Sequence, residues 1–368
     1  MRGDSPADSS IVRRTRWIAA QKAALRGPPV SVIVRGTLRT FVPALLLAIC
    51  AAGVLVRVCL QDRLPGILTW FYYATPPAVL AAVALSAGLW SLVTHRRLIG
   101  LVSMLLTVVC LVWAYRVTWM WNQPAPSAGE TKRILFWNVA HGSFGWPRVL
   151  AEIRRRAADI VGLVEAAADV DVSGMTKPEI EAARAAEAAR MLAFWREQLP
   201  EYTVHVSTSG IALLTRSPLE SVSEGALGGN YWTSFGHFLD GAMQTNRATM
   251  HILVVDIGLD FDRSLWPPLT RLQEILDEMA GRPVVVVGDF NTPTDSVALD
   301  GLRIHFANAF ESAGNGYAAT WPMPVPLITI DQAWASARAP VTRCELGWTW
   351  ASDHRWIELE VAVTPNEE

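Results

Sequence analysis

A buried strand that ends in polar residues is the first candidate for chemistry in this sequence. Four consecutive valines, Val284 to Val287, indicate a strand buried on both faces. The run stops at Gly288-Asp-Phe-Asn291, which is typical of a turn. Residues two apart in an extended segment point the same way, so the side chains of Asp289 and Asn291 could converge on one ligand. Asp and Asn also favour plain turns, and this segment alone fits a capped turn equally well.

Polar residues also close four other predicted strands. They are Asn138, Glu165, Asp331 and the pair Asp353-His354. In layered folds, ligands gather where strand ends meet. Carboxylates with Asn and His make a hard, oxygen-rich site that suits Mg²⁺ or Mn²⁺ better than Zn²⁺. Such a metal could polarise a phosphoryl oxygen while a carboxylate takes a proton from water and His354 stabilises the developing charge.

The elements that must position these residues alternate between strands and helices. We expect helices at residues 149–158, 178–199 and 267–280, and a mobile, glycine-rich and aromatic loop at 225–240. Beside the valine strand, further strands are expected at 133–139, 159–164, 202–207, 210–215, 247–257, 328–335 and 356–363. Because several strands follow one another without a helix, the pattern predicts a mixed sheet packed by helices, or two sheets face to face.

Six short motifs resemble the endonuclease/exonuclease/phosphatase superfamily in their order and rough spacing. They are Phe136-Trp-Asn138, Gly162-Leu-Val-Glu165, Gly210-Ile-Ala-Leu-Leu-Thr-Arg-Ser-Pro218, Gly288-Asp-Phe-Asn291, Ile330-Asp331 and Ser352-Asp-His354. The resemblance covers residues 131–363. It implies a four-layered α/β sandwich, in which two mixed β-sheets are flanked by helices, and metal-dependent cleavage of phosphate esters with Mg²⁺ or Mn²⁺ as the cofactor.

The resemblance implies four catalytic residues. Asp289 would orient or deprotonate the attacking water, and Asn291 would hold the phosphate. His354 would contact the scissile phosphate, with Asp331 supporting it.

Three further residues are implied to form the metal site. Glu165 resembles the principal metal ligand. Asp353 is similar to a second ligand or to a partner for a histidine, and Asn138 would orient or contact the metal site.

Two positions depart from the family pattern. The nuclease branch often has a carboxylate two residues after the first Asn, where this chain has Ala140. The family usually carries a pattern like Val-Asn-x-His-Leu, and Gly258 stands where that histidine is expected. Loss of a phosphate-contacting imidazole could lower the rate by about a hundredfold or more. The candidates to replace it are His141 and His237, whereas His251, earlier on the strand, is expected to be structural or exposed.

Three long apolar stretches precede this domain. The sequence has 368 residues, a hydrophobic content of 51% and a mean hydropathy of +0.24, with the excess before residue 122. Residues 41–60, 70–93 and 98–119 each approach the roughly 20 residues that a helix needs to cross a bilayer. We therefore expect three transmembrane helices, the second kinked at Pro76-Pro77.

The distribution of Lys and Arg predicts the orientation in the membrane. Basic residues are concentrated before residue 40 and in the loop that contains Arg96 and Arg97, which should be cytoplasmic. The predicted organisation is a cytoplasmic basic tail (1–40), a three-helix transmembrane region (41–121), a linker (122–131) and an extracytoplasmic domain (132–364). The layout resembles bacterial plasma-membrane members of the superfamily that are linked to glycopeptide resistance.

These features together favour a membrane-anchored, metal-dependent phosphohydrolase. It would cleave phosphate ester or pyrophosphate bonds of a phosphorylated substrate, and tethering suits a lipid-linked one. An extracytoplasmic nuclease is an alternative, but a net charge of −2 and scattered arginines make nucleic acid a poor match. A degenerate domain that binds phosphorylated ligands without turnover is the other alternative, because of Gly258.

Overall fold

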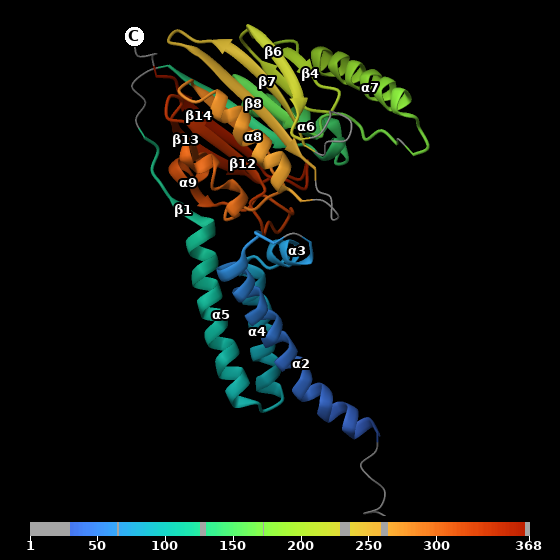
Figure 1. Cartoon of the computed structure of the whole chain (residues 1–368), viewed down its shortest axis with the longest axis vertical. Coiled ribbons are helices and arrows are strands. Elements are labelled where there is room, and N and C mark those ends of the chain that lie inside the picture. Colours follow the sequence, from blue (N-terminus) through green and yellow to red (C-terminus); the bar gives the residue numbers. More distant parts are fainter. Residues whose placement is uncertain are drawn as a thin grey trace, which may run out of the picture. The chain divides into compact units, whose positions relative to one another are not determined.

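The chain forms two compact units. The computed structural model describes residues 30–64, 66–125, 130–171, 173–228, 236–258 and 264–364, with side chains from residue 41 onward (Figure 1). One unit contains residues 1–52 and 80–109, and the other contains residues 53–79 and 110–368. The second unit therefore combines the predicted outer domain with a short segment from far upstream in the sequence.

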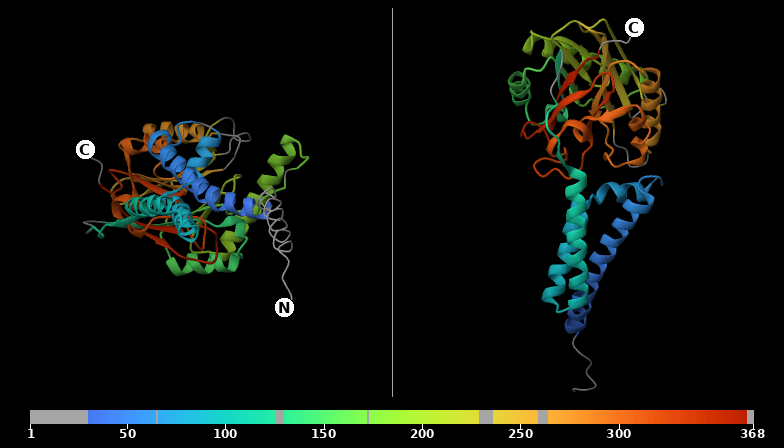
Figure 2. Two further views of the ribbon diagram at one scale, coloured as in Figure 1. Left: turned by 90° about the horizontal axis from the view of Figure 1, so that it is seen from below. Right: turned by 90° about the vertical axis from the view of Figure 1, so that its left-hand side faces the viewer.

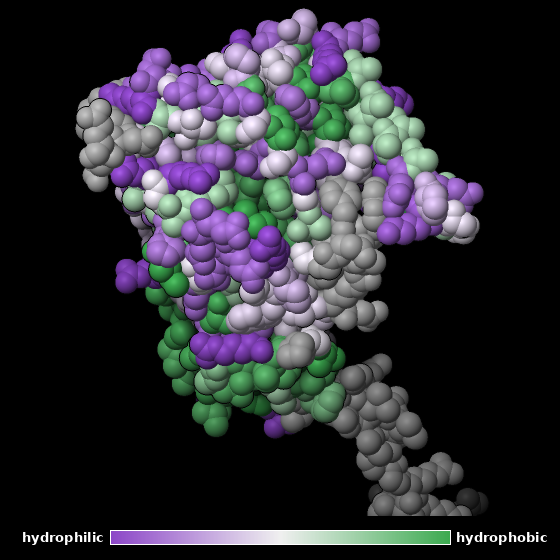
Figure 3. All heavy atoms as spheres, turned by 45° about the horizontal axis from the view of Figure 1, so that its top comes forward, coloured by the Kyte–Doolittle hydropathy of each residue, from purple (hydrophilic) through white to green (hydrophobic). Residues whose placement is uncertain are grey.

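Two helical segments are long and apolar enough to cross a membrane. Phe41–Leu60 runs through the end of α2 (Val30–Leu55) and one π-helical turn, and the other segment is α5 (Arg97–Thr118). Large apolar side chains are exposed along α5, and Figure 3 shows hydrophobic residues gathered over the helical part of the chain. This surface suits lipid better than water.

The second predicted span is not one continuous helix. Residues 70–93 fall into α3 (Ile67–Ala74) and α4 (Pro77–Val93), which are bent by 78° relative to each other. Thr75 and Pro76 each precede a proline, and the proline ring disfavours helical geometry in the residue before it. The expectation of three spanning helices is therefore wrong as stated: two helices qualify alone, and a third exists only if the bent pair counts as one span.

The second unit contains two six-stranded mixed sheets. The first sheet has the order β10-β12-β9-β8-β7-β6, and the second has the order β13-β14-β2-β3-β5-β4. Each contains one parallel pair, β8 with β9 and β2 with β3, and its other pairs are antiparallel. The strands of the first sheet are β6 (Ser221–Ala226), β7 (Gly236–Gln244), β8 (Thr249–Ile257), β9 (Val284–Asp289), β10 (Phe306–Asn308) and β12 (Asp331–Ser336). Those of the second are β2 (Thr131–Asn138), β3 (Ile160–Val164), β4 (Thr203–Val206), β5 (Ala212–Thr215), β13 (Val341–Gly347) and β14 (Trp356–Ala362).

Alternating side chains build three apolar layers from these sheets. Val285 and Val287 of β9 face the core between the sheets, where Phe136 of β2 also lies. Val284 and Val286 face the other way, toward α8 (Trp266–Glu278). The opposite face of the second sheet packs against α6 (Trp146–Arg156) and α7 (Lys177–Gln198), so helices flank both sheets (Figure 2). The four valines are thus buried on both faces, as their sequence predicts.

Two sequence expectations about local structure need correction. Residues 225–240 were expected to form a loop, but β6 and β7 pair through Ala226 and His237, and only residues 229–235 lie outside the described residues. The strand β13 was not expected, because its charged residues break the apolar alternation. Such a strand is stabilised by hydrogen bonds to its neighbour in the sheet, and its local sequence does not predict this pairing.

The segment expected to be a linker begins as part of the domain. After α5, β1 (Trp119–Trp121) pairs with β11 (Asn315–Tyr317). The amide of Ala125 donates to the carbonyl of Thr342 at 3.0 Å. Residues 119–125 are therefore held along the domain by backbone hydrogen bonds, and residues 126–129 lie outside the described part of the chain.

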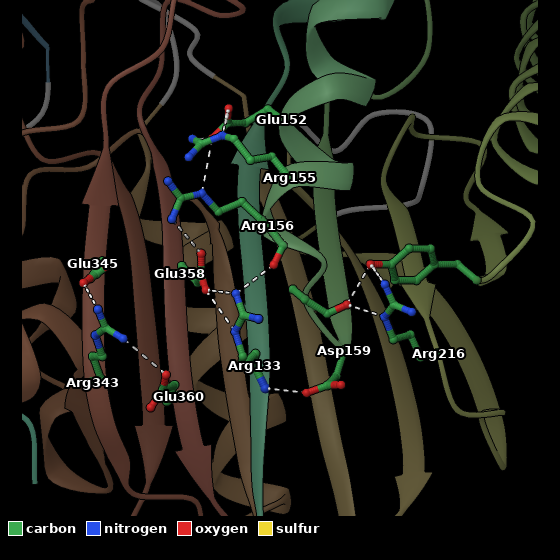
Figure 4. Close-up of polar contacts among 12 residues, drawn as sticks. Arg133, Glu152, Arg155, Arg156, Asp159, Arg216, Arg343, Glu345, Glu358 and Glu360 are labelled. Carbon is green, nitrogen blue, oxygen red and sulfur yellow. Dashed lines mark hydrogen bonds and ion pairs between the residues drawn. The ribbon is translucent and has the colours of Figure 1, made fainter.

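A network of ion pairs covers part of the second sheet (Figure 4). Glu358 on β14 pairs with Arg133 on β2 and, at 3.2 Å, with Arg156 at the end of α6. On β13, Arg343 pairs with Glu345 and, at 3.5 Å, with Glu360 on β14. Each carboxylate in this network has at least one guanidinium neighbour, so its charge is compensated locally.

Candidate functional site

The polar residues predicted from strand ends come from both sheets. Asn138 is the last residue of β2, and Glu165 directly follows β3, its parallel neighbour. In the other sheet, Asp289 ends β9 and stands in register with Asp331, the first residue of the antiparallel strand β12. Parallel strands end at the same edge and an antiparallel neighbour begins there, so the polar residues of each sheet lie together. Across the two sheets, Asn138 meets Asp289, 151 positions away.

Asp331 and His354 form a buried hydrogen-bonded pair. The Nδ1 atom of His354 lies 2.8 Å from Oδ2 and 3.0 Å from Oδ1 of Asp331. The backbone N–H of Asp331 donates to Oγ1 of Thr320, and that of His354 donates to Oγ of Ser352. Ser352 in turn donates to the carbonyl of Asn138 at 2.7 Å, so the turn before β14 is tied to the end of β2.

The side chain of Asn138 connects two carboxylates. Its Nδ2 donates to Oε1 of Glu165 and to Oδ2 of Asp289, both at 3.0 Å. Its Oδ1 accepts from the backbone N–H of Ala140 at 2.9 Å. Asn138 thus turns its amide nitrogen toward the carboxylates and holds acidic groups from the two sheets together.

The Gly-Asp-Phe-Asn turn is capped by its own side chain and also contributes residues to the site. Oδ1 of Asp289 accepts the backbone N–H of Asn291 at 2.9 Å, which is the capped turn that its sequence allows. Asn291 has a φ of 47°, in the left-handed region that Asn tolerates, and its Nδ2 donates to the carbonyl of Ile257 at 2.7 Å. The turn is therefore both a local motif and a bridge to the end of β8.

Burial and neighbouring charges shift the pKa values in this cluster. Burial, followed by the charge of Asp331, raises the pKa of Asp289 well above its usual range. Burial alone would lower the pKa of His354, but the charge and hydrogen bond of Asp331 outweigh it and raise that pKa to about 10. At neutral pH His354 is consequently a cation, and Asp289 binds a proton more readily than an ordinary aspartate does.

Asp256 is a site residue that sequence reasoning missed. It stands in register with Asp289 across the parallel pair β8–β9 and lines the same pocket. Burial, with a further contribution from the charge of Glu165, raises its pKa to about 7. The signal was present: in the run that contains Gly258, Asp256 occupies the position of the Asn in the family pattern.

One pocket of about 760 Å³ brings most of these residues together. Five carboxylates line it: Glu165, Asp169, Asp256, Asp289 and Asp353. His354, His141 and Asn291 also line it, whereas Asp331 lies behind His354 and Asn138 behind Glu165 and Asp289. In the described part of the chain, Arg184 is the only lysine or arginine among its lining residues. The pocket therefore has more acidic than basic groups, and a bound cation would reduce its repulsion of an anionic substrate.

The histidines considered as replacements at Gly258 lie in different places. His141 lines the pocket; its Nε2 is 3.2 Å from Oε2 of Glu165 and its Nδ1 is 2.8 Å from the carbonyl of Ala167. His237 is in register with Asp256 and lines a smaller neighbouring cavity of about 140 Å³. His251 pairs with Asp240 at 3.2 Å and lines neither cavity. His141 is thus the replacement candidate that reaches the carboxylates.

The donor set fits a hard divalent cation. Ligand atoms of Asp289, Asp331 and His354 lie within 4.8 Å of one another, a grouping that could hold a metal ion. His354 already shares its Nδ1 with Asp331, however, which leaves this nitrogen unfavourable for a metal. Glu165 and Asp353, whose side chains are 31% and 39% exposed, offer accessible carboxylates that line the same pocket.

Comparisons with known proteins found one family model and several solved structures. The family model described as "Endonuclease/Exonuclease/phosphatase family" matches residues 135–354. Among solved structures, a family protein from Bacteroides thetaiotaomicron is 14% identical, with 65% of this chain and 98% of that chain covered and a TM-score of 0.49. A mannosyl-6-phosphatase from the same organism is 14% identical, covering 63% of this chain and 99% of that one at a TM-score of 0.49. The human Nocturnin catalytic domain is 18% identical, covering 65% and 97% at a TM-score of 0.46. No curated protein matches the sequence.

The family consists of hydrolases that act on phosphoester bonds and generally depend on a divalent metal. The matched region contains the ends of the strands that bear the acidic pocket, and it extends over more than half of the chain. Two mixed sheets flanked by helices carry it. The chain therefore belongs to the Endonuclease/Exonuclease/phosphatase family.

Proposed function

We propose that this protein is a membrane-anchored, metal-dependent phosphohydrolase that cleaves phosphate ester or pyrophosphate bonds of a lipid-linked substrate. The observation that supports this best is the charge of its pocket. Five carboxylates converge there beside the Asp331–His354 pair, and a bound cation would reduce their repulsion of a phosphate.

Glu165 and Asp353 would hold the metal, Mg²⁺ or Mn²⁺, with Asn138 orienting Glu165 through its amide nitrogen. Bound there, the metal would neutralise negative charge on the phosphoryl group and polarise it. His141 contacts Glu165 at 3.2 Å and would help to orient it.

The remaining residues of the site would act on water and phosphate. Water attacks phosphorus as the bond to the leaving oxygen breaks, and the proton of the water passes to Asp289, whose pKa burial and the charge of Asp331 raise above that of an ordinary aspartate. Asn291 and the protonated His354 hold the phosphoryl oxygens, while Asp331 keeps His354 charged and oriented. The leaving group then takes up a proton from solvent.

The proposed organisation keeps the predicted domain order and orientation. A basic cytoplasmic tail (1–40) precedes the membrane region (41–121), a linker (122–131) whose first residues are held along the domain follows, and the catalytic domain (132–364) faces the outside of a bacterial plasma membrane. This orientation requires α4, which has 17 residues, to cross the membrane as a third segment. Two apolar helices and the exposed apolar surface support anchoring in a membrane. Nucleic acid is a poor candidate substrate, because Arg184 is the only lysine or arginine lining the pocket in the described residues.

The test uses the full chain purified in detergent. Phosphate release from a panel of phosphomonoesters, pyrophosphates and phosphodiesters is measured with Mg²⁺, with Mn²⁺ and with EDTA, and plasmid DNA is included to test for nuclease activity. We expect metal-dependent hydrolysis that Glu165→Ala abolishes and that Glu345→Gln, an exposed glutamate on β13, leaves intact. Absence of release from every substrate, or equal activity of wild type and Glu165→Ala, would overturn the proposal.

A further inference from the structure

A short helix from outside the family match lines the catalytic pocket. Trp70, Tyr73 and Ala74 of α3 line the same pocket as Asp289 and His354. The family match begins only at residue 135, yet residues 53–79 belong to the same compact unit as the catalytic domain. The upstream segment is therefore part of the wall of the site.

A buried arginine fastens this segment to the loop after β9. The guanidinium of Arg57 donates to the carbonyls of Tyr72 at 3.1 Å and Thr75 at 2.5 Å, and lies over the Tyr72 ring. It also pairs with Asp295, four residues beyond Asn291. Because the side chain of Arg57 is only 2% exposed, the loss of this arrangement would leave a buried charge without partners.

A buried aspartate forms a second attachment. The carboxylate of Asp62 accepts hydrogen bonds from Oγ of Ser296 and, at 3.1 Å, from the backbone N–H of Val297. The indole N–H of Trp266, at the start of α8, donates to the carbonyl of Asp62 at 3.0 Å. Polar contacts of two residues that precede α3 thus hold the segment to the catalytic domain.

Apolar packing completes the attachment. Tyr72 and Tyr73 are buried in the same cluster as Leu269 of α8 and Val286 of β9, and Trp70 packs against that cluster. The Trp70 and Tyr73 rings meet edge to face with centroids 5.9 Å apart. A side chain fixed in this way presents a defined surface to the pocket.

The pocket therefore combines two kinds of lining. Its carboxylates and His354 are suited to a metal and a phosphate, whereas Trp70, Tyr73 and Ala74 join Ile328 and Ile330 as an apolar lining. An apolar lining beside a phosphate site gains free energy only from a substrate with an apolar group near its phosphate.

We propose that α3 is a specificity element, in which Trp70 and Tyr73 bind the apolar chain of a long-chain alkyl or prenyl phosphate. The proposal rests on the phosphohydrolase function proposed above. It assigns substrate selection to residues that precede the catalytic domain in sequence.

The test measures chain-length preference with the full chain in one detergent. The substrates are n-alkyl phosphates from propyl to dodecyl, and kcat/KM is obtained from phosphate release. We expect wild type to prefer the longer chains and Trp70→Ala to reduce the dodecyl-to-propyl ratio by about tenfold or more, mainly through KM. Trp70→Phe should retain most of the preference. Ile67→Ala is the matched control, because Ile67 lies on the same helix, is 83% exposed and does not line the pocket.

A second substitution guards against loss of folding in Trp70→Ala. Ala74 is exposed and lines the pocket, so Ala74→Trp adds bulk to the apolar lining without removing a core side chain. We expect it to shift the preference toward shorter chains. Unchanged ratios in both variants would overturn the role of α3 while hydrolysis itself continued. Failure of wild type to hydrolyse any ester would instead overturn the proposed function.

Discussion

Two polar clusters on the same pair of sheets differ in charge balance. In one, arginines pair with the carboxylates, and in the other, carboxylates are in excess. The ion pairs in Figure 4 join four arginines to four carboxylates: Arg133, Arg155, Arg156 and Arg343 with Glu152, Glu345, Glu358 and Glu360. The pocket has five carboxylates among its lining residues and one arginine, Arg184. Both clusters are rich in hydrogen bonds, so the number of contacts does not distinguish them. What differs is whether the charge is compensated within the chain.

This difference separates a structural cluster from a candidate site. In the network each carboxylate gains a cation and its charge is satisfied at the folded surface. In the pocket, burial and like charges raise the pKa values of Asp256 and Asp289, which costs free energy of folding at neutral pH. Such a loss of folding free energy is typical of sites where the uncompensated charge binds a ligand.

The largest expected effect follows from removing the proposed base. Asp289→Asn keeps the shape of the side chain but cannot accept a proton from water. We expect kcat to fall about a thousandfold, on the order of 4 kcal/mol in the barrier, with the folded structure retained. Phosphate release and circular dichroism measure the two quantities. A variant that kept more than about a tenth of the wild-type kcat would show that Asp289 is not the base.

The second effect concerns how the free energy of unfolding depends on pH in the absence of metal. The pKa of Asp256 is about 7 in the folded protein, whereas its ordinary value is 3.8. Between these two pH values the folded state binds a proton that the unfolded state has lost. The free energy of unfolding of the wild type therefore falls as the pH rises from 3.8 to about 7. Asp256→Asn removes this titration. We expect the variant to exceed wild type by on the order of 4 kcal/mol above about pH 7, and to match it near pH 4, by urea unfolding in EDTA. A pH-independent difference would contradict the assignment.

A third test adds a divalent cation to the pocket. Mg²⁺ or Mn²⁺ at about a hundredfold excess over its Kd should stabilise wild type by about 2.7 kcal/mol, through preferential binding to the folded state. Thermal unfolding and calorimetric titration measure this directly. Glu165→Ala should lose the stabilisation, whereas Glu345→Gln should keep it. Equal stabilisation of Glu165→Ala and wild type would place the metal elsewhere.

The smallest expected effect is in the compensated network. Glu358 has a side chain only 11% exposed and contacts Arg133 and Arg156. We expect Glu358→Gln to lower the free energy of unfolding by about 1–2 kcal/mol and to leave kcat unchanged. The loss should shrink in high salt, which screens the wild-type pairs. If kcat of Glu358→Gln fell as much as that of Asp289→Asn, the proposed distinction between a structural cluster and a catalytic one would be contradicted.

Much of the fold could be predicted because its signals are local. The valine run, the motifs around Asn138 and Glu165, and the turn at Asp289 are short segments whose residue types specify a buried strand or a polar end. The mixed sheets flanked by helices follow from their order. The break between α3 and α4 was visible as Pro76-Pro77, but its 78° bend exceeds the kink expected of one span.

Asp256 and the α3 lining could not be identified in the same way. Asp256 lies within an apolar strand, and its sequence does not say that it stands beside Asp289 across the sheet. Trp70 and Tyr73 look like aromatic residues at a membrane interface. Only the contacts of Arg57 and Asp62 with the loop after β9 reveal that these aromatics line the pocket.

The sequence by itself determined which strands end in polar groups, the family, and the apolar character of the helices. The tertiary structure alone decided that Asn138 faces two carboxylates with its amide nitrogen, that His141 rather than His251 reaches the pocket, and that α3 forms part of the wall. The physical reason is that residue type and periodicity are properties of a short segment. Distances between segments, and hence burial and pKa, depend on strand register and on packing between residues far apart in the chain.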